Sequence, residues 1–447
     1  ALPGGRRLAY MYFLYSLALT VFFLALFPYF IYQAARYGKY ASSFRQRMGF
    51  LPESLRPAPS PVIWIHAVSV GEFNAARPLI ASLKESFPQY ALLVSTTTIT
   101  GQRLARESCA SLIDGVFYFP FDWAHTVRRA LDRISPDVVI ILETELWPNF
   151  LRECRRRNLL TIVANGRISP RSYRRYLRAR PFIARVLEQV SLFVMQSDAD
   201  AERARALGAP SHLVRACGNL KYDLASLPSS PNLIKEIDER FALSAYSRVI
   251  VAGSTAPGEE KILLDSLARI RAQVGLEDAR LVIAPRHPER FDEVASLVER
   301  SGFRLARRSR VDDRAGPSSA DVVLLDSIGE LTFVYRFASV VFVGGSLVPR
   351  GGHNIIEPAA CAKPIIVGPH TENFRQIVSD FAAGDALIQL DESGEAAAVS
   401  FAREAVRLLN DRRSAEAMGR RASEILSSNR GATRCTVEAI IELMRKK

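Results

Sequence analysis

The chain has 447 residues and a formal charge of +13, from 59 basic and 46 acidic residues. Its five cysteines are scattered without a Cys-x-x-Cys pair, and its six histidines include no His-x-x-x-His pair. We therefore expect neither a disulfide framework nor a metal site. The basic charge is not accompanied by any DNA- or RNA-binding motif, so nucleic acid is not an expected partner.

The N-terminal residues 1–40 are predicted to form a membrane anchor. Residues 8–35 carry no charge and exceed the roughly 20 apolar residues that span a bilayer. More basic residues follow this segment than precede it, which places the rest of the chain in the cytoplasm. Pro28 interrupts the segment, so a spanning helix and a half-inserted, monotopic anchor both fit the sequence.

Short apolar runs, typical of buried strands, alternate with amphipathic helices along the rest of the chain. This alternation predicts an α/β protein with two parallel sheets, in two facing Rossmann-like domains with a cleft between them. We expect domains at 41–223 and 236–447, a Ser- and Pro-rich linker at 224–235, and C-terminal helices in the second domain. The predicted strands are residues 63–70, 91–97, 138–142, 160–163, 192–195 and 214–216, then 249–252, 281–284, 322–325, 340–343, 365–367 and 387–390.

Glu72 follows the first predicted strand through Gly71, at the start of a predicted helix. The turn after a parallel strand lies at the carboxyl edge of the sheet, where open α/β sheets bind ligands. A carboxylate at this edge suits a general base. An acidic residue that complements a helix dipole is the alternative interpretation of the same pattern.

The basic charge is concentrated in two segments. Residues 1–60 hold seven basic residues and one acidic residue, and residues 151–180 hold ten Arg and one Glu. Because Arg binds phosphate oxygens bidentately, the second segment indicates contact with anionic headgroups or a phosphorylated lipid. A solvated basic helix face is the alternative.

Small polar and cationic residues follow the strands of the second domain. They include Ser254 and Thr255, then Pro285, Arg286 and His287, and a Gly-rich stretch at 344–357. Such a turn offers backbone N–H groups to phosphate, although a purely structural tight turn has the same composition. There is no G-x-G-x-x-G after the first strand of either domain and no G-x-x-x-x-G-K-[ST], so we expect a nucleotide site but neither a dehydrogenase nor an ATPase.

Six motifs in register resemble the 3-deoxy-D-manno-octulosonic acid (Kdo) transferase family of lipopolysaccharide synthesis. The resemblance extends from the anchor to about residue 373, and the motifs are HAVSVGE at 66–72, ETELWPN at 143–149, NGRIS at 165–169, GNLKYD at 218–223, APRHPER at 284–290 and GGSLVPRGGHNIIEPAA at 344–360. It implies the GT-B fold and inverting transfer of Kdo from CMP-Kdo to a lipid A precursor at the cytoplasmic face of the inner membrane. It implies no metal and no cofactor.

The resemblance also implies residue roles. Glu72 matches the catalytic base, whereas Glu143 and Lys221 match groups that stabilise the transition state; Glu145 ranks lower, because it would point to the other strand face. We infer that the basic segment meets lipid A phosphates through Arg167, Arg171, Arg174, Arg175 and Arg178. The residues expected to bind the donor are Ser254, Thr255, Pro285, Arg286, His287, Ile328, Gly329, Glu330, Gly345, Asn354, Ile355, Ile356 and Glu357.

Two other functions fit the same patterns. A GT-B enzyme that uses a UDP-sugar on another lipid acceptor differs in the nucleotide that it binds. A non-catalytic membrane-anchored protein that binds acidic lipids would not need Glu72. The motifs fix neither the number of Kdo residues transferred nor the oligomeric state.

Overall fold

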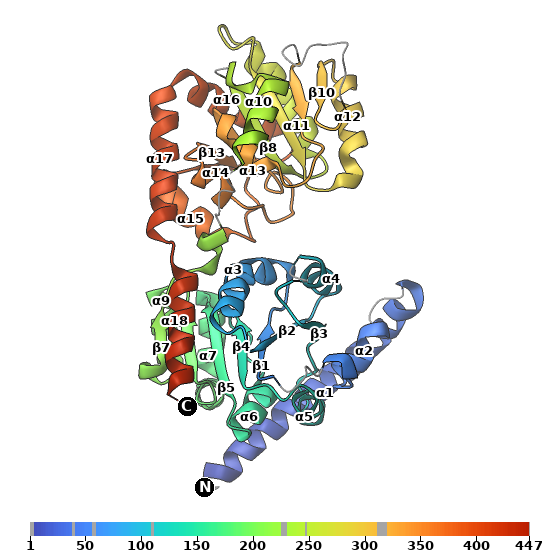
Figure 1. The fold of residues 1–447 in the computed structure, drawn as a ribbon, viewed down its shortest axis with the longest axis vertical. Coiled ribbons are helices and arrows are strands. Elements are labelled where there is room, and N and C mark those ends of the chain that lie inside the picture. The colour runs from blue at the N-terminus through green and yellow to red at the C-terminus, as the bar shows by residue number, and fades with distance from the viewer. Residues whose placement is uncertain are drawn as a thin grey trace. The chain divides into compact units, whose positions relative to one another are not determined.

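The computed structural model describes residues 4–37, 41–55, 60–108, 111–224, 230–245, 248–310 and 320–446. The chain forms two compact units (Figure 1). Unit 1 comprises Ala1–Leu224 and Arg430–Lys447, and unit 2 comprises Ala225–Asn429. Of the predicted linker, residues 225–229 lie outside the described residues, and residues 231–235 belong to a helix, α10 (Pro231–Phe241).

Unit 1 contains a parallel sheet of seven strands in the order β3-β2-β1-β4-β5-β6-β7. The strand order reverses between β1 and β4, and ligands bind at the carboxyl ends of strands at such a switch point. Both faces of the sheet are buried, which is why central strands such as β4 are continuously apolar. The strands are β1 (Val62–His66), β2 (Ala91–Thr96), β3 (Gly115–Tyr118), β4 (Val138–Leu142), β5 (Leu160–Gly166), β6 (Leu192–Met195) and β7 (Val214–Ala216).

Helices cover both faces of this sheet. Trp64 packs into one core cluster with Phe117 and Phe150, while its neighbours Ile63 and Ile65 pack into the cluster on the other face. The helices are α1 (Gly4–Tyr37), α2 (Ala41–Arg47), α3 (Val70–Ser86), α4 (Ile99–Ser108), α5 (Ala124–Ile134), α6 (Pro148–Arg156), α7 (Pro170–Arg178), α8 (Arg180–Leu187), α9 (Asp198–Leu207) and α18 (Ala432–Arg445), with short 3-10 turns at Glu53–Leu55, Ser211–Leu213 and Leu220–Leu224.

Unit 2 repeats the architecture with the order β10-β11-β9-β8-β12-β13-β14, all parallel, and a switch point between β8 and β12. Its strands are β8 (Val249–Thr255), β9 (Arg280–Pro285), β10 (Leu305–Arg307), β11 (Val322–Leu324), β12 (Val340–Val343), β13 (Ile365–Val367) and β14 (Ile388–Gln389). Besides α10, its helices are α11 (Glu259–Arg271), α12 (Phe291–Arg300), α13 (Leu331–Val334), α14 (Ile356–Ala360), α15 (Arg375–Ala383), α16 (Glu395–Asn410) and α17 (Arg412–Ser428), with 3-10 turns at Leu243–Ala245, Pro288–Arg290 and Tyr335–Phe337.

The C-terminal helix α18 belongs to unit 1, not to the second domain as predicted (Figure 1). The carboxylate of Asp223 accepts hydrogen bonds from the backbone amides of Gly431 and Thr433 at 2.8 and 2.6 Å, which caps the helix. Apolar residues of α18, among them Val437 and Ile440, complete the core cluster that contains Ile63. The sequence shows that this segment is helical but not which sheet it covers.

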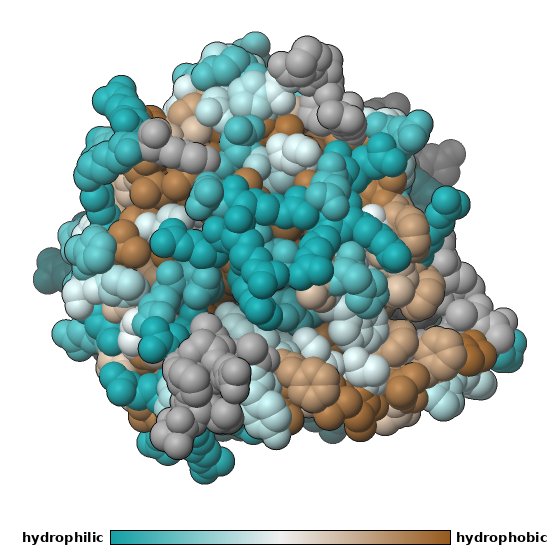
Figure 2. Space-filling view, turned by 90° about the horizontal axis from the view of Figure 1, so that it is seen from below, coloured by the Kyte–Doolittle hydropathy of each residue, from teal (hydrophilic) through white to brown (hydrophobic). Residues whose placement is uncertain are grey.

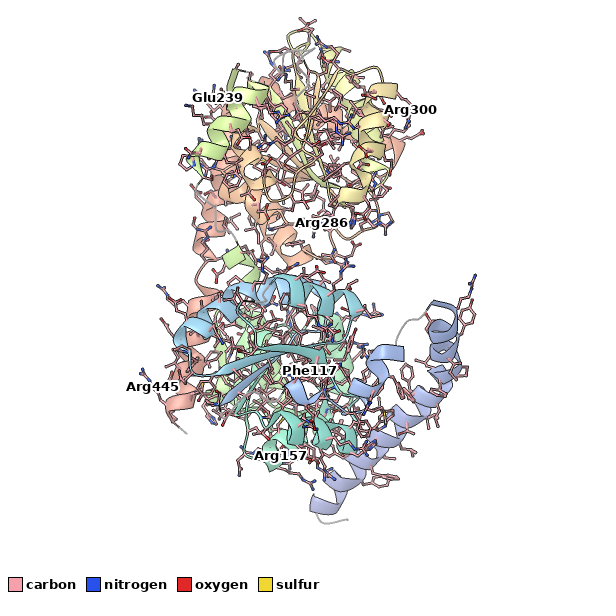
Figure 3. The ribbon with its side chains drawn as sticks, turned by 45° about the vertical axis from the view of Figure 1, so that its right-hand side comes forward. Phe117, Arg157, Glu239, Arg286, Arg300 and Arg445 are labelled. Atoms are coloured by element: carbon pink, nitrogen blue, oxygen red, sulfur yellow. A yellow bond between two sulfur atoms is a disulfide. The ribbon has the colours of Figure 1, made fainter. Side chains whose placement is uncertain are left out.

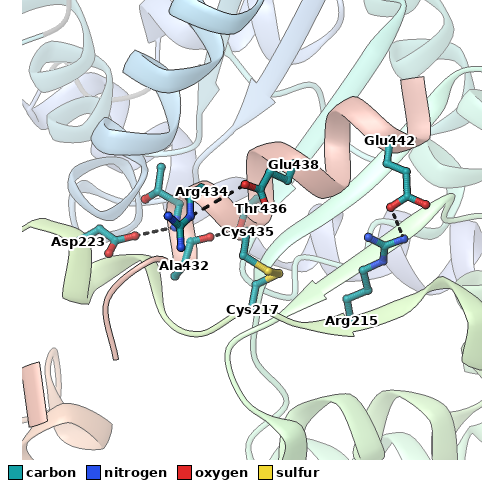
Figure 4. Close-up of a disulfide and its surroundings, with 10 residues drawn as sticks. Arg215, Cys217, Asp223, Ala432, Arg434, Cys435, Thr436, Glu438 and Glu442 are labelled. Carbon is teal, nitrogen blue, oxygen red and sulfur yellow. Dashed lines mark hydrogen bonds and ion pairs between the residues drawn. A yellow bond between two sulfur atoms is a disulfide. The ribbon is translucent and has the colours of Figure 1, made fainter. Parts of the chain in front are cut away.

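A disulfide joins Cys217, after β7, to Cys435 of α18, with the Cα atoms 5.6 Å apart (Figure 4). The expectation of no disulfide is therefore wrong. The two cysteines are 218 residues apart and meet because α18 returns to unit 1. Cys spacing along the sequence cannot reveal a pairing that depends on this return.

Candidate active site

Glu72 lies in the first turn of α3, directly after β1. Ser69 caps this helix, since its hydroxyl oxygen accepts a hydrogen bond from the Glu72 amide at 3.3 Å. The Glu72 carboxylate in turn accepts hydrogen bonds from the Val68 amide at 2.7 Å and from the Ser69 hydroxyl at 3.2 Å. This reciprocal arrangement resembles a capping box in which the amide of Val68 replaces that of the N-cap residue, and it fixes the carboxylate at the edge of the sheet.

The environment of Glu72 favours its protonated form. Burial raises the pKa of Glu72 to about 8, and the charges of Glu143 and Glu145 act in the same direction, against the hydrogen bonds from Val68 and Ser69. An acidic residue that only caps a helix does not need a raised pKa. A carboxyl group whose pKa lies near neutral pH has the property expected of a general base.

Glu143 follows β4, the neighbour of β1 across the switch point. Its backbone has φ +56°, which is unusual for a residue with a side chain and is common at functional sites. The next residue, Thr144, accepts a hydrogen bond from the Arg167 amide at 2.8 Å and donates to its carbonyl. Because β4 ends at Leu142, Glu145 does not occupy the opposite face of a continued strand, and its charge acts on Glu72 as well.

Lys221 lies in the 3-10 turn after β7. Its backbone amide donates to Asn219 Oδ1, and the amide of Leu220 donates to Asn165 Oδ1, both at 3.0 Å. Burial lowers the pKa of Lys221; the charges of Glu143 and Glu72 oppose this shift, whereas that of Arg167 adds to it. The ammonium group therefore lies within electrostatic reach of both carboxylates.

The structure thus brings together the three residues predicted to be catalytic, at the carboxyl edge of the sheet of unit 1. They come from three segments that are distant in the sequence, after β1, β4 and β7. A carboxyl group with a raised pKa, a second carboxylate and a buried ammonium group form a set that can accept a proton and compensate negative charge. The chemical role of each residue stays a prediction.

The Gly-rich turn after β12 in unit 2 already binds an anionic group of the protein itself. The fully buried carboxylate of Glu259 accepts hydrogen bonds from the amides of Gly345, Ser346, Leu347 and Ala256 at 2.7–2.9 Å. The Gly345 amide is therefore already hydrogen-bonded to Glu259, and a contact of Gly345 with the donor stays a prediction. These amides are therefore not open to a ligand in this structure.

Three cationic or titratable side chains gather beside this turn. Arg286 is exposed in the loop after β9, at the carboxyl edge of the sheet of unit 2 (Figure 3). The ring of His353 packs against Gly345, whose φ of +69° and lack of a side chain leave space for it. Burial, and then the charges of Arg286 and His287, lower the pKa of His353 to about 4. The group combines positive charge with a neutral imidazole and suits an anionic ligand.

Ser254 and Thr255 lie beside the same turn, and the carbonyl of Thr255 accepts a hydrogen bond from the amide of Arg286 at 3.0 Å. This bond joins the ends of β8 and β9, where Pro285 is buried. The hydroxyl of Thr255 donates to buried Glu260 at 2.8 Å, so Thr255 has a structural partner.

The remaining predicted donor residues differ in what they offer a ligand. Glu357 accepts hydrogen bonds from Asn354 and from Thr332 at 3.0 Å, and its carboxylate is only partly buried. Ile355 and Ile356 are buried in the core, so a ligand would meet their backbone and not their side chains.

Glu330 is held in an ion pair. Arg308 donates hydrogen bonds to both carboxylate oxygens of Glu330 at 2.8 and 3.0 Å, and Ser327 donates a third. Burial raises the pKa of Glu330, but these hydrogen bonds outweigh burial, so the pKa lies below its ordinary value. Ile328, by contrast, is 81% exposed, and Gly329 after it has φ +87°.

The basic segment lies at the surface of unit 1. No residue of α7 is buried, and Arg171, Arg174, Arg175 and Arg178 are all exposed. Within the described part of the chain, no carboxylate forms an ion pair with these four side chains. Figure 2 shows hydrophilic side chains gathered in the middle of the face seen from below. Arg167 lies apart from them, partly buried beside Lys221.

A family model described as 3-deoxy-D-manno-octulosonic-acid transferase (kdotransferase) matches residues 42–224. The 3-deoxy-D-manno-octulosonic acid transferase of Haemophilus influenzae is 34% identical over 410 residues, which cover 91% of this chain and 92% of that protein. The corresponding transferase of Bordetella pertussis is 32% identical over 391 residues, covering 86% and 88%. The chain belongs to the Kdo transferase family.

Membership of the Kdo transferase family confirms the resemblance and makes the chain a glycosyltransferase. Its two Rossmann-like units have the GT-B fold. A UDP-GlcNAc 2-epimerase from Neisseria meningitidis, solved with UDP-GlcNAc, shares this fold with a TM-score of 0.54, 14% identity and coverage of 86% of this chain and 100% of that one. At this identity the likeness concerns the fold alone.

Four residues in or beside the candidate site were not predicted as site residues or were ranked low. Asn165 and Glu259 act inside the protein, by holding the Lys221 loop and the Gly-rich turn. His353 and Glu145 lie among the charged groups of their units. Asn165 and His353 stand within the motifs NGRIS and GGSLVPRGGHNIIE, which is the signal that could have found them.

Proposed function

We propose that this Kdo transferase moves Kdo from CMP-Kdo to a hydroxyl of a lipid A precursor at the cytoplasmic face of the inner membrane, with inversion and without a metal. The observation that carries the proposal is the convergence of Glu72, Glu143 and Lys221 at the carboxyl edge of the sheet of unit 1, where burial raises the pKa of Glu72. Family membership supports Kdo as the transferred sugar, and the resemblance supports CMP-Kdo as its donor.

Glu72 acts as the general base. Its carboxylate accepts the proton of the acceptor hydroxyl while the oxygen of that hydroxyl attacks the anomeric carbon of Kdo. The bond from this carbon to the phosphate oxygen breaks, and CMP leaves with the electron pair. Attack from the face opposite to the leaving group inverts the anomeric centre. Lys221 and Glu143 stabilise the charges that develop in the transition state.

Unit 2 binds the donor. Arg286, His287 and His353 form the group that meets the phosphate of CMP, and the carboxylate of Glu357 accepts hydrogen bonds from the ribose hydroxyls. The exposed backbone at Ile328 and Gly329 is available to the base. Glu259 keeps the Gly-rich turn in place but does not touch the donor.

The exposed Arg residues of α7 meet the phosphates of lipid A. Four side chains without a carboxylate partner in the described residues provide positive charge that is not neutralised within the protein. An acceptor with phosphate groups on its sugar headgroup matches this charge. Arg167 acts closer to the reaction, beside Lys221.

The test combines the purified protein with freshly generated CMP-Kdo and tetraacylated lipid A precursor, with and without EDTA. We expect Kdo additions by mass spectrometry that survive EDTA, and their number gives the number of sugars transferred. Glu72→Gln should abolish transfer but retain CMP binding, whereas Glu85→Gln, an exposed carboxylate on the same helix, should leave transfer unchanged. Transfer by Glu72→Gln would refute the role of the base, and loss of transfer in EDTA would refute metal independence.

A UDP-sugar donor is the second candidate, and competition by nucleotides separates the two. We expect CMP to inhibit transfer at concentrations at which UDP does not. Inhibition by UDP alone, together with no Kdo addition by the unmodified protein, would replace the proposed donor.

A further inference from the structure

The N-terminal helix α1 is docked along the body of unit 1 by one of its faces. Its segment Tyr10–Tyr29 is long and apolar enough to cross a membrane. Within it, the sheltered positions recur every three to four residues, which is the repeat of one helix face. They include Tyr12, Tyr15, Ser16, Leu19, Thr20 and Phe23.

Three polar side chains in the middle of this segment form hydrogen bonds with the body of unit 1. Tyr15 donates a hydrogen bond to Asp122 at 2.9 Å. Ser16 accepts one from Asn149 at 3.0 Å. The third contact comes from the indole of Trp123, which donates to the Thr20 hydroxyl at 3.0 Å.

Aromatic contacts extend the same interface at both ends. The guanidinium of Arg152 lies 4.6 Å from the ring centre of Tyr12, and Phe182 of α8 packs edge-on against this ring at 5.5 Å. Further along, Phe23 packs edge-on against Phe121 and Trp123. The docking surface is therefore built from α6, α8 and the loop before α5, and it has charged and polar groups along it.

The opposite face of α1 is apolar and exposed. Six large apolar side chains on this face are between 43% and 63% exposed, and no polar residue lies between them. They are Phe13, Leu14, Leu17, Val21, Phe22 and Leu24. An apolar stripe of this length on a protein surface marks an interaction site. The hydrocarbon of a bilayer is the occupant whose chemistry fits it, because the basic segment with Arg152 adjoins the helix and suits anionic headgroups.

We propose that α1 lies in the plane of the membrane surface and does not cross the bilayer. From Tyr12 to Phe23 the docked face is about 16 Å long, since each residue adds about 1.5 Å. A helix that crossed a hydrocarbon core roughly 30 Å thick would carry Asp122, Asn149 and Arg152 into that core. Charged groups at such depth are strongly disfavoured. In the plane, the apolar stripe enters the lipid while the polar contacts stay with unit 1.

This inference depends on the membrane location in the proposed function, but not on the donor, the acceptor or the base. It decides between the two anchors that the sequence leaves open. With α1 in the plane, the N-terminus and the body lie on the same side of the membrane. With α1 across the bilayer, they lie on opposite sides.

The decisive experiment places one protease-cleavable tag ahead of residue 1 and another after residue 447, in the full-length protein in its native membrane. We expect a protease added to sealed, inverted inner-membrane vesicles to remove both tags, and the same protease added to spheroplasts to remove neither. Cleavage of the N-terminal tag in spheroplasts but not in inverted vesicles would overturn the proposal. So would an N-terminal tag that is cut in neither preparation while the C-terminal tag is cut in inverted vesicles. Recovery of the protein in the soluble fraction would overturn it too. Kdo transfer, measured separately, shows whether the proposed function fails.

A second measurement tests the apolar stripe itself by flotation with phosphatidylethanolamine–phosphatidylglycerol vesicles. Val21→Asp should weaken vesicle binding at least about tenfold, because this side chain is 59% exposed on the lipid-facing side. Val274→Asp is the matched control, since Val274 is 96% exposed in unit 2, and it should bind as the unmodified protein does. Equal binding by both variants and the unmodified protein would overturn the proposal. Circular dichroism of both variants confirms that they are folded.

Discussion

The side-chain oxygen of Asn165 accepts a hydrogen bond from the backbone amide of Leu220 at 3.0 Å, which ties the loop that carries Lys221 to the end of β5. Asn165 is buried and has φ +55°, a backbone conformation that Asn and Gly adopt more readily than most residues. Asn165 is therefore a positioning residue for Lys221. Its side chain supplies the hydrogen-bond acceptor, and its backbone supplies the left-handed conformation at this point.

Substitutions at Asn165 separate these two contributions. Asn165→Gly keeps the backbone conformation but removes the acceptor, so Leu220 loses its buried partner and Lys221 its fixed position. We expect kcat to fall about 10- to 100-fold with a smaller change in KM. Asn165→Asp keeps an acceptor at the same place and should retain the melting temperature better than Asn165→Gly. Steady-state kinetics and thermal unfolding check both, and a Gly variant with normal kcat would contradict the role.

The pH dependence of transfer should report the pKa of Glu72. The base must be deprotonated to accept a proton, so kcat/KM should rise with pH and level off above about 8. Glu143→Gln removes the charge that raises this pKa most and should move the rising limb to lower pH, even though it slows transfer. Glu145→Gln should move it in the same direction by less. If the rising limb of the pH profile does not move in Glu143→Gln, the carboxylates of Glu72 and Glu143 are not coupled.

The same pKa predicts how Glu72 affects stability. Its folded-state pKa of about 8 lies above the ordinary value of 4.5, so the folded protein binds this proton more tightly than the unfolded chain. The resulting stabilisation is complete below pH 4.5 and is lost as the pH rises through about 8. Because Glu72→Gln cannot ionise, its melting temperature should exceed that of the unmodified protein by a margin that widens from pH 5 to pH 9. Glu85→Gln, on the same helix but exposed, should show no such widening.

Much of the fold could be predicted from the sequence, because the central strands are buried on both faces and therefore continuously apolar. The strands that escaped prediction, β3 (Gly115–Tyr118) and β10 (Leu305–Arg307), each form one of the two edges of their sheet. They are short, at four and three residues, and only partly buried, so each gives a weak strand pattern. The first strand was predicted to reach Val70 but ends at His66, since Ser69 caps the following helix.

The site was predictable to the extent that its residues follow strands. Glu72 and Glu143 stand directly after β1 and β4, and parallel strands end at one edge of the sheet. The contact between Glu259 and the Gly-rich turn was not predictable, because it joins residues 86–88 positions apart through backbone amides. A Gly-rich turn has the same composition whether it binds a phosphate or a carboxylate of its own chain.

The Glu259 contact can be tested by an isosteric change. All four partners of its carboxylate are N–H donors, so the amide group of Glu259→Gln would face donors that it cannot satisfy. We expect the free energy of unfolding to fall by about 2–4 kcal/mol, as buried donors lose their acceptor. Glu299→Gln, an exposed change of the same kind in unit 2, should alter it little. Denaturant unfolding measures both, and equal midpoints would contradict the role of Glu259.

The basic face of α7 should control affinity for the acceptor and not for the donor. In the triple variant Arg174→Gln, Arg175→Gln and Arg178→Gln, all three side chains are exposed, so the fold should be unaffected. We expect kcat/KM for the lipid A precursor to fall at least about tenfold at low salt, because charge-assisted bonds to phosphate are lost. The deficit should shrink as ionic strength rises, since salt screens exposed charges in both proteins. The affinity for CMP, measured by calorimetry, should not change.

The matched control removes the same charge from unit 2, at Arg269, Arg300 and Arg413, which are also exposed. If both triple variants lose acceptor activity equally, net charge and not the face of α7 attracts the acceptor. If neither loses it, the phosphates of the acceptor bind elsewhere. If only the α7 variant loses activity, and it matches the unmodified protein on a dephosphorylated acceptor, these Arg residues bind the phosphates of the acceptor.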